Sequence, residues 1–320
     1  FILLWKAEQH NLGNDCRLGK ARVKGGAKLN NITILRSGAI GDFVLTLPAI
    51  NTIHKAFPTK ELRLIGNPAT LALYGNAAHL DHDDPRLIAL HRDGTIPATT
   101  RALFADCERA LAYATDPQGH LQRRLAQLVA GPVLLWDPRP AVGTNDHIVD
   151  HLLRPLAQWS VPICSRTPHI TVDQYKTDVP PQIIIHPGSS SPAKCWPKAQ
   201  FAALHSALER RGLHATLLCG PVELERGFTP DHSTICPPDL SALATLLAGA
   251  RLFIGNDSGP GHIAAAVGTP TLSLFGPTDP GIWSPRHPRS RILQTPDINN
   301  IHLSAVVEVA LQMLEEAPHG

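Results

Sequence analysis

Short apolar runs alternate along the chain with segments whose apolar residues recur at helical spacing. The first run, Ile32–Arg36, is rich in β-branched residues and predicts a buried strand, and Phe43–Phe57 predicts a helix. Further strands are predicted at Glu61–Ile65, Arg109–Thr115, Pro132–Trp136, Gln182–His186, His214–Cys219, Thr234–Cys236, Arg251–Gly255 and Thr271–Phe275. Further helices are predicted at Gln118–Ala130, His147–Trp159, Pro197–Arg211, Leu240–Ala248, His262–Val267 and Leu303–Glu316. Strands that alternate with helices build parallel sheets, so the pattern predicts an α/β fold.

The alternation is interrupted once, near the middle of the chain. Residues 160–181 contain four prolines and little periodicity, and a new strand begins at Gln182. We therefore predict two Rossmann-like, doubly wound domains that face a central cleft. The predicted parts are a basic, partly disordered extension, a first domain, a linker, a second domain and a final helix, at residues 1–30, 31–160, 161–181, 182–302 and 303–320.

Composition narrows the class of protein. The 320 residues are 43% hydrophobic and 18% charged, which is typical of a globular chain with room for two domains. The net charge of +2 gives no argument for nucleic-acid binding. The six cysteines form no C-x-x-C pair and no zinc-finger spacing, and no secretory signal is visible. We therefore expect a reduced, cytoplasmic protein.

A glycine-rich turn in the second half carries the strongest chemical signal. Asn256–Gly261 joins the predicted strand Arg251–Gly255 to an alanine-rich helix. Free backbone N–H groups at a helix start attract anions, and glycine lets a ligand approach the backbone closely. The turn therefore predicts a site for phosphate or pyrophosphate. The alternative is that Asp257 and Ser258 merely cap the helix.

Two sets of carboxylates in the first half, one of them a pair, are candidates for chemistry. Asp42 follows the turn after the first strand, at the sheet edge where open α/β folds bind ligands, although it can also serve as a helix cap. Asp81 and Asp83 form a D-x-D pair of the kind that holds a divalent metal, but the surrounding loop is polar. We interpret this pair as a solvated loop, and we predict no metal site.

Four segments, taken together and in this order, resemble one known family. They are LRSGAIGDFVLTLPAI, HPGSSSPAKCWP, CGPVELER and IGNDSGPGHIAAAVGTPTLSLFGPTDP, at Leu35–Ile50, His186–Pro197, Cys219–Arg226 and Ile254–Pro280. They look like glycosyltransferase family 9, the lipopolysaccharide heptosyltransferases. The resemblance extends from Asn31 to the C-terminus. It implies the GT-B fold, with the nucleotide-sugar held mainly by the C-terminal domain, the acceptor mainly by the N-terminal domain, and inversion without a bound metal or other cofactor.

The resemblance also implies roles for individual residues. Asp42 matches the proposed general base, which would take the proton of the acceptor hydroxyl. Lys194 matches the lysine ahead of Trp-Pro, which would stabilise charge on the leaving diphosphate, although a solvated loop lysine is the alternative. The residues that we expect to bind the donor are Ser189, Ser190, Glu223, Asp257, Ser258, Gly259 and His262. Those that we expect to contact the acceptor are Ser37, Gly38 and Gly41.

Two of these donor assignments leave alternatives open. His262 lies one helical turn beyond Ser258, and a core histidine would fit that position equally. Glu223 is our choice for the ribose hydroxyls, but the spacing after Gly220 also allows Glu225.

We therefore expect an enzyme that moves heptose from ADP-L-glycero-D-manno-heptose to a lipopolysaccharide inner-core acceptor. The expected partners are the nucleotide-sugar and a lipid-linked saccharide, met peripherally at the inner face of the cytoplasmic membrane by a monomer. Another nucleotide-sugar is the alternative donor, and a non-catalytic sugar-nucleotide-binding protein is the alternative class. An NAD-dependent oxidoreductase is disfavoured, because no G-x-G-x-x-G follows the first strand.

Overall fold

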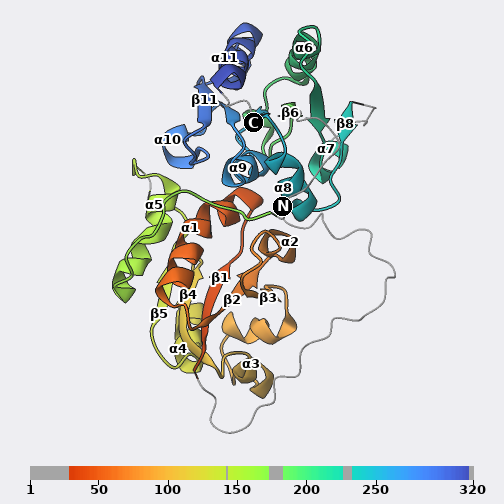
Figure 1. The fold of residues 1–320 in the computed structure, drawn as a ribbon. Helices are drawn as coiled ribbons and strands as arrows, with labels where there is room; N and C mark the ends of the chain where they lie inside the picture. Colours follow the sequence, from red (N-terminus) through yellow and green to blue (C-terminus); the bar gives the residue numbers. More distant parts are fainter. Residues whose placement is uncertain (1–28, 142, 173–182, 226–232, 317–320) are drawn as a thin grey trace, which may run out of the picture.

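The computed structural model describes residues 29–141, 143–172, 183–225 and 233–316. Most of the expected extension at residues 1–30, and residues 173–181 of the expected linker, lie outside these described residues. The described chain forms two parallel sheets, each flanked by helices, which confirms the predicted α/β class with two sheets. Figure 1 shows the first half of the chain below and the second half above. The domain boundaries themselves stay a prediction.

The first sheet has the strand order β3-β2-β1-β4-β5, and all its neighbouring strands are parallel. Its strands are β1 (Asn31–Arg36), β2 (Glu61–Gly66), β3 (Ala78–Asp81), β4 (Cys107–Tyr113) and β5 (Val133–Trp136). The α-helices of this half are α1 (Ile40–Ala56), α2 (Pro68–Leu71), α3 (Ala98–Leu103), α4 (His120–Leu128) and α5 (Ile148–Leu153). Two 3₁₀ helices complete it, η1 (Pro85–Leu90) and η2 (Arg154–Trp159).

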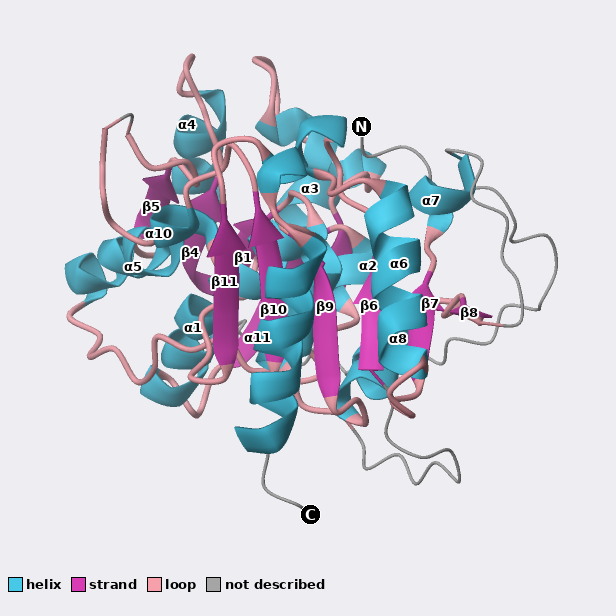
Figure 2. Ribbon diagram, turned by 90° about the horizontal axis from the view of Figure 1, so that it is seen from above, coloured by secondary structure: helices cyan, strands magenta, loops and turns pink. Residues whose placement is uncertain are grey.

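The second sheet has the order β11-β10-β9-β6-β7-β8 and is also parallel. Its strands are β6 (Ile183–His186), β7 (Ala215–Leu218), β8 (Thr234–Ile235), β9 (Leu252–Asn256), β10 (Thr271–Phe275) and β11 (Ser290–Gln294). Its helices are α6 (Lys198–Glu209), α7 (Pro221–Glu225), α8 (Leu240–Ala248), α9 (Gly259–Ala266), α10 (Pro280–Trp283), α11 (Leu303–Glu316), η3 (Pro192–Lys194) and η4 (Ile298–Asn300). Figure 2 shows α6 and α11 across the outer face of this sheet.

The two halves share a continuous apolar cluster. The cluster joins buried residues of α1 and β1 to buried residues of α8 and α9, so α1 packs directly against α9. Leu47 of α1 and Ile263 of α9 are both fully buried in it. Truncating a leucine in such a site to alanine costs about 2–5 kcal/mol of stability. The starts of α1 and α9, which follow β1 and β9, therefore meet at the boundary between the halves.

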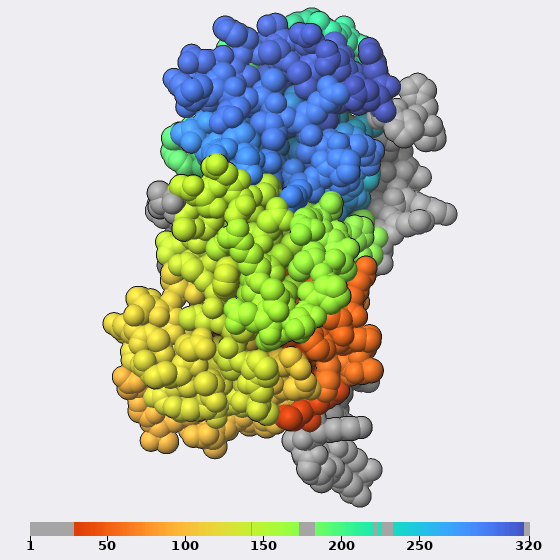
Figure 3. All heavy atoms as spheres, turned by 90° about the vertical axis from the view of Figure 1, so that its left-hand side faces the viewer, coloured from red at the N-terminus to blue at the C-terminus, as the bar shows by residue number. Residues whose placement is uncertain are grey.

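Polar contacts close the boundary on the side of α5. Asp150 of α5 forms an ion pair with Arg286, at 2.6 Å between Oδ2 and the guanidinium. Nε2 of His147 lies 3.0 Å from the carbonyl oxygen of Ser284. Figure 3 shows this face, where yellow-green residues of the first half meet blue residues of the second. These contacts join the two halves on the side of α5.

Several elements differ from the predicted ones for physical reasons. The predicted helix His147–Trp159 is a short α5 followed by η2, because Pro155 lacks an N–H group and cannot continue an α-helical ladder. The edge strands β3 and β11 were not predicted, since their residues are partly exposed and polar. Asp81, expected in a polar loop, is the last residue of β3. Within the described ranges, no helix is both long enough and apolar enough to span a membrane.

Candidate active site

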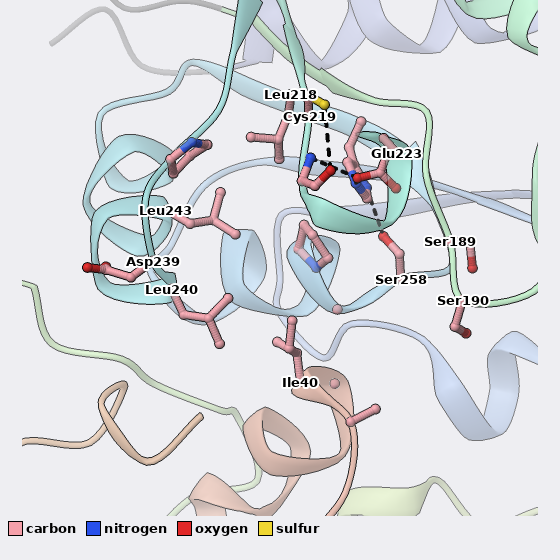
Figure 4. A pocket seen from close by; sticks show the side chains of 17 residues that line it. Ile40, Ser189, Ser190, Leu218, Cys219, Glu223, Asp239, Leu240, Leu243 and Ser258 are labelled. Carbon is pink, nitrogen blue, oxygen red and sulfur yellow. Dashed lines mark hydrogen bonds and ion pairs between the residues drawn. The ribbon is translucent and has the colours of Figure 1, made fainter. Parts of the chain in front are cut away.

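A cavity of about 210 Å³ lies where the two halves meet. The first half contributes the start of α1 to its wall, and the second half contributes the ends of β6 and β7 and the starts of α8 and α9. Its lining residues are Ala39, Ile40, Gly41, His186, Ser189, Ser190, Leu218, Cys219, Gly220, Glu223, Pro237, Asp239, Leu240, Leu243, Ser258, Gly259 and Pro260. Figure 4 shows Leu240 and Leu243 at one side of the cavity and Ser189, Ser190 and Ser258 at the other. The cavity therefore has an apolar side and a hydroxyl-rich side.

The start of α9 forms part of the hydroxyl-rich side. Ser258 is the N-cap residue of α9 and has an extended backbone, but its side chain makes no capping hydrogen bond. Its Oγ instead lies 3.3 Å from Nδ1 of His186. The first-turn N–H groups and the positive end of the helix dipole are directed toward this side of the cavity. The arrangement can therefore bind an anion, as the glycine-rich turn predicted.

The loop that follows β6 is attached to the end of β9 through Asn256. The buried side chain of Asn256 accepts a hydrogen bond from the backbone N–H of Trp196 at 2.9 Å and donates one to the carbonyl of Pro187 at 2.9 Å. Ser189 donates its hydroxyl to the carbonyl of Asp257 at 2.8 Å. The sequence analysis missed Asn256; the available signal was a polar residue at the end of an otherwise apolar strand.

Lys194 and Asp257 form an ion pair beside the cavity. The distance from Nζ to Oδ2 of Asp257 is 2.7 Å, and the side chains are 29% and 7% exposed. Asp257, which immediately precedes Ser258, therefore faces a lysine of the loop that follows β6. This ion pair fixes the loop after β6 relative to the end of β9. The ammonium of Lys194 is fixed close to the anion-binding end of α9.

His262 lies fully inside the boundary between the halves. Burial lowers the pKa of His262 to about 4, and the negative charges of Asp257 and Asp42 oppose this effect. Its Nδ1 atom has no hydrogen-bond partner among the described residues. The ring packs closely against the start of α1. A Cβ atom added at Gly41 would lie only 2.8 Å from Cδ2 of His262. His262 is thus a buried, neutral imidazole that lies near both predicted catalytic residues.

Asp42 occupies the first turn of α1, where its carboxylate is held on two sides. Oδ2 accepts a hydrogen bond from the backbone N–H of Ala39 at 3.0 Å, and Oδ1 lies 3.7 Å from the buried guanidinium of Arg36. Burial lowers the pKa of Arg36, while the charge of Asp42 acts in the opposite direction. Gly38 has a φ of +147°, and a Cβ atom there would lie 2.9 Å from Asp42 Oδ2. The turn thus holds the carboxylate, whose side chain is 38% exposed.

Glu223 is the acidic residue of α7 that reaches the cavity. Its Oε2 accepts from the Gly220 N–H at 2.8 Å and lies 3.6 Å from Nε2 of His186. Burial alone would raise the pKa of Glu223, but the hydrogen bonds and charge of His186 and the Gly220 N–H outweigh it and hold the pKa below its ordinary value. Glu225 is exposed and does not line the cavity. The structure therefore distinguishes the two glutamates, which the spacing did not.

The expected site residues fall into three groups. Those that line the cavity are Gly41, Ser189, Ser190, Glu223, Ser258 and Gly259. Those that surround His262 just outside the lining, close enough for their charges to shift its pKa, are Asp42, Lys194 and Asp257. Ser37 and Gly38 lie in the turn after β1 and do not line the cavity. His186 lines the cavity but was not expected there.

The described residues contain no group of three or more His, Cys, Asp or Glu side chains that could hold a metal ion. His82 lies between Asp81 and Asp83, with one ring nitrogen 3.5 Å from each carboxylate. The D-x-D pair therefore interacts with the histidine between its two acids.

Comparison with known proteins agrees with the fold and with the sequence motifs. The structure of Escherichia coli ADP-heptose lipopolysaccharide heptosyltransferase II has a TM-score of 0.71 to this chain at 17% identity, and the match covers 90% of this chain and 100% of that one. At that identity the likeness concerns the fold alone, which is the GT-B fold.

Sequence comparison matches the chain to one family. The model of glycosyltransferase family 9 (heptosyltransferase) matches residues 148–306. Lipopolysaccharide heptosyltransferase 3 of Escherichia coli is 40% identical over 113 residues, which are 32% of this chain and 33% of that protein. Lipopolysaccharide heptosyltransferase 1 of Escherichia coli K12 is 24% identical over 311 residues, 86% of this chain and 96% of that protein.

The part of the chain that matches the family 9 model contains three of the four motifs, those that begin at His186, Cys219 and Ile254. The match to heptosyltransferase 3 spans only about a third of that relative's length. The first motif, Leu35–Ile50, lies outside the part that the family model matches.

Proposed function

We propose that this protein is an inverting heptosyltransferase that moves heptose from ADP-L-glycero-D-manno-heptose to a lipopolysaccharide inner-core acceptor. One observation carries the proposal: the cavity joins the anion-binding start of α9 to an apolar side from α8 and an acidic residue from α7. These are the parts that a diphosphate, a nucleobase and a ribose require. The name of the structural relative includes ADP-heptose, which supports the choice of donor.

The donor is proposed to lie along the cavity with its diphosphate at α9. Ser258, the Gly259 N–H and the hydroxyl of Ser190 would contact the diphosphate oxygens. Ser189, whose hydroxyl donates to the Asp257 carbonyl, would hold the loop beside them. The adenine would lie against the side chains of Leu240 and Leu243 and their apolar neighbours. The anionic Glu223 accepts hydrogen bonds only, so it suits the ribose hydroxyls, which donate them.

The sugar is proposed to lie between the diphosphate site and Asp42. The acceptor hydroxyl would attack the anomeric carbon on the face opposite the diphosphate, which inverts that centre. Asp42 would take the hydroxyl proton as the new carbon–oxygen bond forms. The leaving diphosphate would carry away the electron pair of the broken bond, and the Lys194 ammonium would stabilise the charge that grows on it.

Arg36 and the Ala39 N–H fix the orientation of the Asp42 carboxylate that this step needs. Lys194 is already held beside α9 by its ion pair with Asp257. Both groups are therefore positioned before substrate arrives, which is the condition for effective electrostatic stabilisation.

The acceptor is proposed to be a lipid-linked saccharide that enters from the first half of the chain, past Ser37, Gly38 and Gly41. The protein would act without a metal cofactor, in the cytoplasm, as a monomer in peripheral contact with the inner face of the cytoplasmic membrane. A transferase for another nucleotide-sugar would use the same cavity.

Calorimetric titration with ADP, UDP and GDP, with and without magnesium, tests the donor. Preference for ADP without magnesium dependence is expected. Turnover of ADP-heptose with isolated inner-core acceptor, followed by mass spectrometry, tests the reaction. The variant Asp42→Asn should bind ADP normally and lose turnover by at least about a hundredfold. Preference for UDP or GDP would refute the heptose donor, and full turnover by Asp42→Asn would refute the base.

A further inference from the structure

His186 connects two ends of the proposed donor site that come from different elements. Its Nδ1 lies 3.3 Å from Oγ of Ser258 at the start of α9, and its Nε2 lies 3.6 Å from Oε2 of Glu223 in α7. The ring is 4% exposed and tilted against Phe253, with 6.4 Å between ring centroids. Figure 4 shows Glu223 and Ser258 at the two ends of this line of contacts. His186 thus links the proposed ribose and diphosphate positions.

The hydrogen atoms available to Glu223, His186 and Ser258 can be counted. The backbone N–H of Gly220 donates to Oε2 of Glu223 at 2.8 Å, which favours the carboxylate form, so this side chain is ionised at neutral pH and accepts hydrogen bonds only. The atom that faces it at 3.6 Å is Nε2 of His186, and a hydrogen on Nε2 avoids placing two acceptors against each other. A neutral imidazole has one N–H group, so its Nδ1 has to accept a hydrogen bond from the Ser258 hydroxyl. Only lone pairs of Ser258 Oγ then remain for a ligand.

A diphosphate cannot use those lone pairs, because its own oxygens are also acceptors. A second proton on His186 removes the conflict. Nδ1 then donates to Ser258 Oγ, and the Ser258 hydroxyl hydrogen becomes free to donate to a phosphate oxygen. The positive imidazolium lies between the Glu223 carboxylate and the incoming diphosphate, which both stabilise it.

We propose that binding of the donor diphosphate is coupled to the uptake of one proton by His186. His186 is then a positioning residue that turns the Ser258 hydroxyl into a hydrogen-bond donor. The inference rests on the proposed function, because it uses the diphosphate position given above.

The other titratable groups around His186 leave this assignment in place. Cys219, at the end of β7, is a neutral thiol, since burial raises its pKa to about 12. Asp257, next to Ser258, is already paired with Lys194. His262 of α9 is neutral, with its pKa lowered to about 4 by burial. Glu223 is the ionised carboxylate that faces the ring.

Calorimetry on the full chain tests the coupling, with ADP-glucose as the probe. Its diphosphate is esterified at both ends and does not titrate near neutral pH, whereas a terminal phosphate has a second pKa of about 6. Titrations at about pH 8, above the ordinary imidazole pKa of about 6.5, are run in buffers of different ionisation enthalpy. We expect nearly one proton taken up per nucleotide bound, and affinity that falls about tenfold per pH unit in that range.

Variants assign the proton to its residue. His186→Asn places an amide near the Nδ1 position that can donate to Ser258 without an added proton, so uptake and the pH dependence should both vanish. Ser258→Ala, a small change at the helix start, should also abolish uptake. His205→Asn is the matched control, since its Nε2 contacts the Ala215 carbonyl at 3.0 Å, and it should keep full uptake.

The outcomes separate this inference from the proposed function. Binding of ADP-glucose without proton uptake would overturn the coupling and leave the donor site intact. Uptake that persists in His186→Asn, or that disappears in His262→Asn alone, would assign the proton elsewhere and overturn it too. Failure of ADP-glucose, ADP, UDP and GDP all to bind would refute the donor site itself, and the coupling with it.

Discussion

Gly41 and His262 are in contact across the boundary between the two halves of the chain. A Cβ atom on residue 41 would lie 2.8 Å from Cδ2 of the buried histidine. A matching contact is made from the second half toward the first, where a Cβ atom on Gly259 would lie 2.7 Å from Cβ of Ile40. The two helix starts approach this closely only because both positions lack a side chain. The contact keeps Asp42, on the first turn of α1, beside the anion-binding start of α9.

The variant Gly41→Ala should separate the starts of α1 and α9. The added methyl group meets a fully buried ring, and overpacking of this kind costs about 1–3 kcal/mol. We expect a lower free energy of unfolding in urea and at least about a tenfold loss of turnover, because reacting groups must be held within fractions of an ångström. Gly75→Ala, where a Cβ atom meets nothing within 4 Å, is the control. Wild-type turnover by Gly41→Ala would contradict the importance of this contact.

Gly188→Ala should weaken donor binding by displacing Glu223. A Cβ atom on residue 188 would lie 1.7 Å from Oε1 of Glu223 and 2.9 Å from Nε2 of His186. The flexible carboxylate can move away, so the fold should survive while the ribose contact is lost. We expect about a tenfold rise in the donor KM, as for the loss of a charged hydrogen bond, with a smaller change in kcat. Steady-state kinetics beside Gly75→Ala measure this, and an unchanged KM would argue against the ribose role of Glu223.

Asn256→Ala should destabilise the second half of the chain. The change leaves the Trp196 N–H and the Pro187 carbonyl without their partner in a buried place. Buried groups left unsatisfied cost about 1–3 kcal/mol each, so we expect a loss of about 2–4 kcal/mol in urea unfolding. The exposed Asn299→Ala serves as the comparison and should change stability by less than about 0.5 kcal/mol. Equal stability of the two variants would show that Asn256 does not secure the loop.

His262 should make stability depend on pH between about 4 and 6.5. Its folded pKa is lowered to about 4 from an ordinary value of 6.5, chiefly by burial. Below pH 6.5 His262 becomes protonated in the unfolded chain, whereas in the folded chain it stays neutral until about pH 4. The free energy of unfolding should therefore fall by up to about 3 kcal/mol as the pH drops across this window, and His262 should contribute no further loss below it.

Urea unfolding at a series of pH values measures the effect of His262. The variant His262→Gln lacks the titrating group, so its stability should depend less steeply on pH in the same window. The control is His205→Gln, because His205 is only partly buried and lies away from the boundary. Parallel pH profiles for the wild type and His262→Gln would assign the dependence to other groups.

The sequence predicted the buried strands and the long helices well, because their apolar residues repeat with a period that local geometry requires. β10 and α8 have the predicted bounds, and α1 begins at Ile40, three residues before the prediction. The earlier start follows from Asp42, whose carboxylate reaches back to the Ala39 N–H and extends the first turn. The partly exposed edge strands β3 and β11 have no comparable periodic signal.

Within the candidate site, the sequence by itself determined the local chemistry: a glycine-rich helix start at Ser258 and Gly259, a carboxylate in the first turn of α1, and a lysine in a hydroxyl-rich loop. Each of these depends on residues that are neighbours in the chain, so a short segment suffices to reveal it. Only the tertiary structure decided that Glu223 and not Glu225 reaches the cavity. It alone brought His186 between Glu223 and Ser258, and Gly41 against His262. These pairings depend on strand order and helix packing, which bring together residues that are far apart along the chain and that no local pattern relates.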